Sequence, residues 1–82
     1  MQRFDFSAPA ELYASRGMRA GRHPVRYRRF DSSAEAIRFA VEELGEDMLR
    51  GTDIESEDAR LDGMRIRALY LSAEYPLKRV SD

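Results

Sequence analysis

A segment near the middle of the chain, DSSAEAIRFAVEELG, restricts the possible folds more than any other part. Ser32 precedes Glu35 by three positions, the capping-box spacing that satisfies two free backbone amides at a helix start. Gly45 is suited to end the helix, because glycine adopts positive φ without steric cost. The buried face of an amphipathic helix is indicated by apolar residues at the i, i+3, i+4, i+7 spacing: Ile37, Ala40, Val41 and Leu44.

A second helix is predicted near the end of the chain. Asp62 can cap its first turn, and Pro76 stops it because the residue before a proline is disfavoured in the helical region. The expected buried stripe consists of Ile66, Leu69, Tyr70 and Ala73. Tyr75 and its neighbours are expected to pack on the core, with an exposed contact patch as the alternative.

Extended structure is predicted before the first helix. In VRYRRF, Val25 and Tyr27 alternate with two arginines, which is the pattern of a half-buried strand. We therefore expect Tyr27 on the core side, the arginines on the solvent side, and a bulge or strand end near Arg29 that returns Phe30 to the core. Pro24 suits the start of an edge strand. Two arrangements stay open: PAELYASR forms a hairpin with this strand, or residues 10–16 lie outside the sheet.

A weaker strand is predicted in DMLRGTDIES, with Gly51 as a possible bulge and Met48, Leu49 and Ile54 as packing residues. An acidic turn, ESEDARLDG, follows. The order β-β-α-β-α predicts a small α+β domain over 1–82, with two or three short strands, two amphipathic helices packed on one face, and loose ends at about 1–6 and 78–82. An apolar open face of such a short sheet would favour a homodimer.

The chain has 82 residues and no cysteine, so disulfides, thiolate nucleophiles and cysteine zinc sites are excluded. A small secreted domain usually carries disulfides, and the sequence shows neither a signal-peptide core nor a membrane-span window. These observations predict a cytoplasmic protein.

Charge is distributed unevenly along the chain. Residues 12–30 carry six arginines and no acid, whereas residues 31–62 carry eleven acids and three arginines, and the whole chain has net charge −1. The candidate contact residues in the arginine-rich segment are Arg16, Arg19, Arg22, Arg26, Arg28 and Tyr27. Guanidinium groups pair with phosphates and a tyrosine ring can stack on bases, but nucleic-acid-binding domains are usually basic overall.

The sequence predicts a noncatalytic interaction or regulatory domain that binds an unknown protein partner or itself through these arginines. The alternative is an RNA- or single-stranded-DNA-binding module that uses the same arginines and Tyr27. In the simplest interpretation, Arg26 and Arg28 protect an edge strand from unwanted pairing, and the remaining arginines solvate a loop or pair with acids of residues 53–62.

No pattern in the sequence indicates catalysis. His23 is the single histidine and lacks a neighbouring carboxylate and nucleophile. Glu42 and Glu43 are adjacent and point to different sides of their helix. A calcium loop counted from Asp53 lacks the glycine and the glutamate that it needs. We predict no enzyme activity, no cofactor and no metal.

Two segments, RYRRFDSSAEAIRFAVEEL and DGMRIRALYLSAEYPL, resemble a group of short bacterial proteins known mainly from genome sequences. The resemblance covers a little under half of the chain and implies that both helices are real. The group has no assigned activity, so it implies no catalytic or binding residue.

Overall fold

A computed structural model describes residues 4–14, 26–57 and 59–77 of the chain. The elements follow in the order β1 (Ala10–Ala14), β2 (Arg26–Phe30), α1 (Ser33–Arg38), the π-helical segment η2 (Phe39–Leu44), α2 (Gly45–Leu49), β3 (Thr52–Ser56), β4 (Arg60–Leu61) and α3 (Gly63–Leu71). The predicted α+β class is confirmed.

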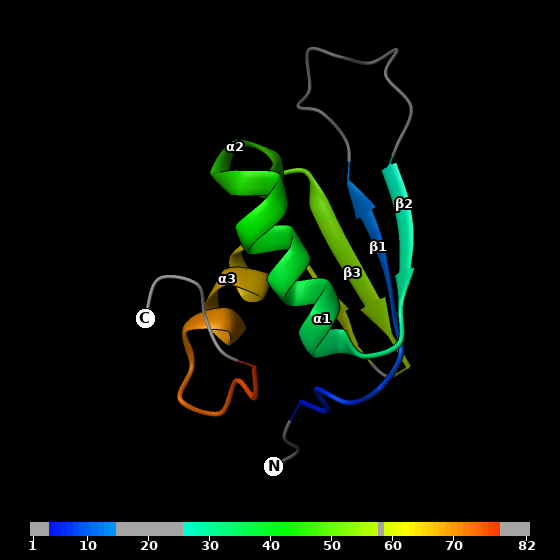
Figure 1. The fold of residues 1–82 in the computed structure, drawn as a ribbon. Helices are drawn as coiled ribbons and strands as arrows, with labels where there is room; N and C mark the ends of the chain where they lie inside the picture. Colours follow the sequence, from blue (N-terminus) through cyan, green and yellow to red (C-terminus); the bar gives the residue numbers. More distant parts are fainter. Residues whose placement is uncertain (1–3, 15–25, 58, 78–82) are drawn as a thin grey trace.

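The four strands form one antiparallel sheet in the order β2-β1-β3-β4. The predicted hairpin partner, β1, is therefore a central strand, and β2 lies at one edge. The described helices all pack on one face of the sheet, with α1 over β1 and β2 and α3 over β3 and β4 (Figure 1). On β1, that face carries the buried residues Ala10, Leu12 and Ala14.

The first helix begins as predicted. The Ser32 hydroxyl accepts a hydrogen bond of 3.2 Å from the Glu35 amide, and Ile37 and Ala40 are fully buried. After Arg38 the helix widens into the π-helical η2, and the helical path continues through α2 to Leu49. Gly45 marks this junction with φ +83° and ψ 172°, a conformation that almost only glycine adopts.

The last helix also begins as predicted, because an Asp62 carboxylate oxygen accepts a 2.9 Å hydrogen bond from the Arg65 amide. Ile66 and Tyr70 are buried. The helix ends at Leu71, earlier than Pro76 requires, so the expectation that Ala73 belongs to the buried stripe is wrong: Ala73 is exposed.

Two local predictions in the middle of the chain are also wrong. Met48 and Leu49 belong to the end of α2, and the strand starts only at Thr52, after a turn at residues 50–51. The segment interpreted as an acidic turn contains β4, in which Leu61 pairs with Ile54. The strand has two residues, and the core buries the apolar side chain of one of them, Leu61. The sheet therefore has four strands instead of two or three.

Aromatic side chains close one end of the core. Tyr75 is buried, and its hydroxyl donates a 2.7 Å hydrogen bond to the carbonyl of Ala34. Its ring lies edge-on to Phe6, with centroids 5.7 Å apart, and Phe4 packs on Phe6 in the same manner. Tyr75 is thus core, as expected, and residues 4–6 are held against it. The single-domain prediction and its loose ends stay predictions.

Candidate interaction surface

The side chains of β2 alternate in the opposite phase to the one that we predicted. Its register with β1 is continuous from Ala10 opposite Phe30 to Ala14 opposite Arg26, without a bulge. Phe30 therefore shares the helix-covered face with Arg28, and Tyr27 lies on the open face with Arg29. Tyr27 is 55% exposed, so the prediction that it faces the core is wrong.

Arg28 lies at the margin of the helix-covered face. Its guanidinium carbon is 5.2 Å from the centroid of the Phe30 ring and 4.9 Å from that of Phe39. The two rings pack against each other with centroids 5.5 Å apart. A guanidinium over aromatic faces at such distances is a cation–π contact, so Arg28 shields apolar rings at the edge of the core.

Two tyrosines and one glutamate lie together on the open face, on β1 and the edge strand β2. The rings of Tyr13 and Tyr27 lie opposite each other on β1 and β2, with centroids 5.3 Å apart. Glu11 accepts a hydrogen bond from each: 2.9 Å from the Tyr13 hydroxyl and 3.1 Å from the Tyr27 hydroxyl. We call Glu11, Tyr13 and Tyr27 the tyrosine pair site.

The shared carboxylate changes the ionisation of both phenols. Each hydroxyl donates to Glu11, and this bond would be lost on ionisation, so it raises the pKa of Tyr13 and of Tyr27 above 10.0. Partial desolvation raises both pKa values further. The phenols therefore stay neutral donors over the physiological pH range, and neither is an activated base.

Charges of both signs surround the tyrosine pair site. Arg29 lies opposite Glu11 in the register. On the other side, Arg60 of β4 reaches Asp53 at 3.5 Å and Glu55 at 3.7 Å. The open face thus carries charged groups and tyrosines instead of an apolar surface, and the reason given for a homodimer does not apply to it. The homodimer itself stays a prediction.

Only part of the predicted contact segment can be placed. Arg16, Arg19 and Arg22 lie outside the described residues, as does His23, and for Arg26 only its position in β2 is given. Our prediction missed Arg29, Glu11 and Tyr13. Strict alternation counted back from Phe30 would have found Arg29 and Tyr27 on one face, since the sheet then needs no bulge.

The adjacent glutamates of η2 have different surroundings. Glu42 accepts a hydrogen bond from the Tyr70 hydroxyl, whereas Glu43 is exposed, so the two carboxylates point apart as predicted. Among the residues that the structure describes, no group of three or more acidic or histidine side chains is placed to hold a metal ion.

Comparisons of the chain with protein-family models, with curated proteins and with solved structures found no match. The resemblance of two segments to short bacterial proteins stays a prediction. Within the described ranges, no helix is both long and apolar enough to cross a membrane.

Proposed function

We propose that the protein is a noncatalytic interaction domain that binds an acidic, extended segment of a partner protein along strand β2. The observation that carries the proposal is the edge position of β2, which presents the exposed Tyr27 beside Arg29 on the open face. An edge strand offers backbone donors and acceptors to an added strand, and the flanking side chains set its specificity. The absence of cysteine supports the cytoplasm as its compartment.

The charge of the open face favours a protein over a nucleic acid. Among the described residues of this face, the carboxylates Glu11, Asp53 and Glu55 outnumber the two arginines Arg29 and Arg60. A polyanion laid across this face would meet carboxylates beside the tyrosines, and an RNA base stacked on Tyr27 would place its phosphates near Glu11. A peptide strand at the β2 edge avoids these carboxylates, because they lie on the inner strands β1 and β3.

The charge of β2 itself favours an acidic partner over a second copy. Three of its five residues are arginines, and pairing two β2 strands would bring like charges together across the new ladder. A strand with acidic side chains replaces this repulsion with opposite-charge pairs of about 0.2–1 kcal/mol each.

The test is a fluorescence-anisotropy titration with three labelled probes: a peptide of alternating Glu and Thr, a peptide of alternating Lys and Thr, and a random single-stranded RNA of the same length. We expect the Glu–Thr peptide to bind at least about tenfold more tightly than the Lys–Thr peptide. Amide hydrogen exchange should slow in residues 26–30 when the Glu–Thr peptide is bound.

Variants localise the binding. Tyr27→Ala should weaken binding of the Glu–Thr peptide by at least about 5-fold, as loss of an anchoring aromatic does. Arg29→Ala should weaken the same binding by about 2- to 5-fold. Arg38→Ala, an exposed arginine of α1, is the matched control and should have no effect. Equal affinity for both peptides would refute the proposal. Tighter binding of RNA, weakened by the same two variants, would establish the nucleic-acid alternative instead.

A further inference from the structure

Helix α3 is apolar on two opposite faces. Its inner face buries Ile66 and Tyr70 in the core. Its outer face carries Met64, Ala68 and Leu71 at the i, i+4, i+7 spacing, with Met64 80% and Leu71 60% exposed. A helix that is apolar on both sides is typical of one that is covered on both sides. We call Met64, Ala68 and Leu71 the outer stripe.

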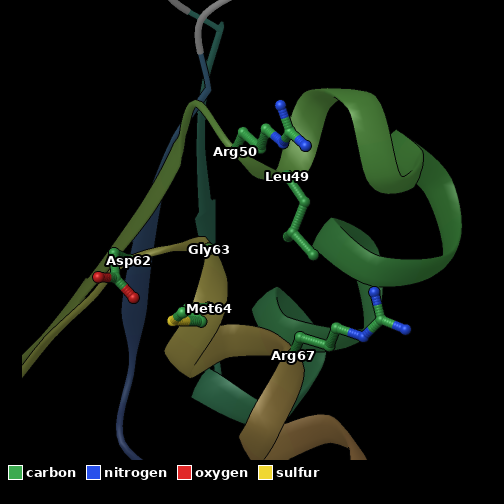
Figure 2. Close-up of a pocket in the computed structure, with 6 residues that line it drawn as sticks. All are labelled: Leu49, Arg50, Asp62, Gly63, Met64 and Arg67. Atoms are coloured by element: carbon green, nitrogen blue, oxygen red, sulfur yellow. The ribbon is translucent and has the colours of Figure 1, made fainter.

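A cavity extends the outer stripe towards the end of α2. It has a volume of about 470 Å³ and is lined by Leu49, Arg50, Asp62, Gly63, Met64 and Arg67. The Leu49 side chain points from the end of α2 towards α3, and Met64 lies at the start of α3 (Figure 2). An apolar side chain placed in this cavity would contact Leu49 and Met64 together.

Three exposed arginines flank the outer stripe and the cavity. Arg65 and Arg67 are exposed on α3, and Arg50 is exposed at the other side of the cavity. On the helical wheel, Arg65 and Arg67 lie on opposite flanks of the outer stripe, about 100° ahead of Met64 and about 60° behind it. Asp62 is the acidic residue that lines the cavity, and its carboxylate already accepts the Arg65 amide.

We propose that the outer stripe and the cavity form a docking site for an acidic amphipathic helix of a partner protein. An apolar anchor enters the cavity at Leu49 and Met64, and a second anchor covers Leu71, about 10 Å further along α3. Glutamate or aspartate side chains flanking these anchors meet Arg50, Arg65 and Arg67. The site lies on the helical side of the sheet, so it is independent of the function proposed for β2.

The arginines of α3 disfavour binding of the outer stripe to the same stripe of a second copy. In a parallel pair of α3 helices, Arg67 of one copy faces Arg65 of the other. In an antiparallel pair, each arginine faces its own counterpart. Both arrangements bring like charges together along the flanks of the apolar contact, which disfavours pairing. The positive flanks instead complement an acidic helix.

The test uses the full chain and three labelled 16-residue peptides of helical design. The first carries leucine at i, i+4 and i+7 with glutamate at the flanking positions. The second has lysine in place of each glutamate, and the third has serine in place of each leucine. We expect the first to bind at least about tenfold more tightly than either of the others, and its affinity to fall as salt is added.

Variants of the outer stripe and its flanks provide the decisive controls. The double variant Met64→Ser with Leu71→Ser should weaken binding of the glutamate peptide at least about tenfold. Arg65→Glu with Arg67→Glu should reverse the preference towards the lysine peptide, and a glutamate at position 65 suits the first helical turn. Tyr27→Ala should leave this binding unchanged, which separates it from the β2 site.

Three outcomes would overturn the proposal. One is equal binding of the glutamate and lysine peptides. Another is binding that survives both double variants while circular dichroism shows the variants to be folded. The third is sedimentation showing a dimer that Met64→Ser with Leu71→Ser dissociates, because the stripe would then be covered by a second copy.

Discussion

Replacement of Gly63 by alanine tests the close approach of the start of α3 to the end of α2. A Cβ atom at position 63 would lie 2.2 Å from the carbonyl oxygen of Leu49 and 2.9 Å from its carbonyl carbon. Favourable contacts between carbon atoms have separations of about 3.5–4.0 Å. The overlapping atoms are backbone, so no side-chain rotation relieves them, and the end of α2 must move away from the start of α3.

The magnitude follows from two opposing terms. Overpacking costs about 1–3 kcal/mol, and a rigid backbone neighbour favours the upper end of that range. In a helix interior alanine is a better helix former than glycine by about 1 kcal/mol, so at the first residue of α3 this gain offsets at most that part of the cost. We therefore expect Gly63→Ala to lower the free energy of unfolding by about 2 kcal/mol, which for a domain of this size lowers Tm by about 8–16 °C.

Urea unfolding followed by far-ultraviolet circular dichroism measures this difference directly. Ala68→Gly, at an exposed position of the same helix, is the matched control, and it should cost about 1 kcal/mol through propensity alone. A Gly63→Ala variant as stable as the natural chain, or more stable, would refute the close approach of Leu49 to α3.

Three further changes test other contacts. Tyr75→Phe removes the buried hydroxyl that donates to Ala34, and urea unfolding should show a loss of about 1–2 kcal/mol; an unchanged midpoint would contradict that hydrogen bond. Gly45→Ala should cost about 1–3 kcal/mol because of its positive φ, although no atom lies within 4 Å of the added Cβ; full stability would mean that another conformation is accessible there. Glu11→Gln should lower the raised pKa values of Tyr13 and Tyr27 in a spectrophotometric titration. Because the folded state holds these protons more tightly, the Glu11 contribution to stability is present below pH 10 and is lost as the pH rises through the folded-state pKa values. A variant with unchanged phenol titration would argue against the shared hydrogen bonds.

The parts of the fold predicted correctly depend on local interactions. The caps at Ser32 and Asp62 involve residues three positions apart, so the sequence alone contains both partners. The π-helical widening after Arg38 does not leave such a local signal. Leu49 was correctly assigned to the core but to the wrong element, because a buried apolar side chain suits a helix end and a strand equally well.

Counting back from Phe30 gives the observed phase of β2, but the residues of the strand do not themselves decide whether Phe30 or Tyr27 is buried. RYRRF contains one aromatic residue in each phase, Tyr27 and Phe30, separated by an odd number of positions. The register with β1 and the packing against Phe39, which follows α1, place Phe30 on the covered face. The candidate contact surface therefore depends on long-range contacts, and a one-residue error in phase exchanged Arg28 for Arg29.

The corrected phase strengthens the argument for a protein partner at β2. In the predicted phase, Arg26 and Arg28 would form a purely basic strip on the solvent side, which suits a phosphate backbone. In the observed phase, Arg28 is engaged with Phe30 and Phe39, and the open face presents Tyr27 beside Arg29. Among the described residues of the open face, β2 contributes one aromatic and one cation. This pair fits the added strand that we propose better than a nucleic-acid backbone, whose binding uses repeated cations.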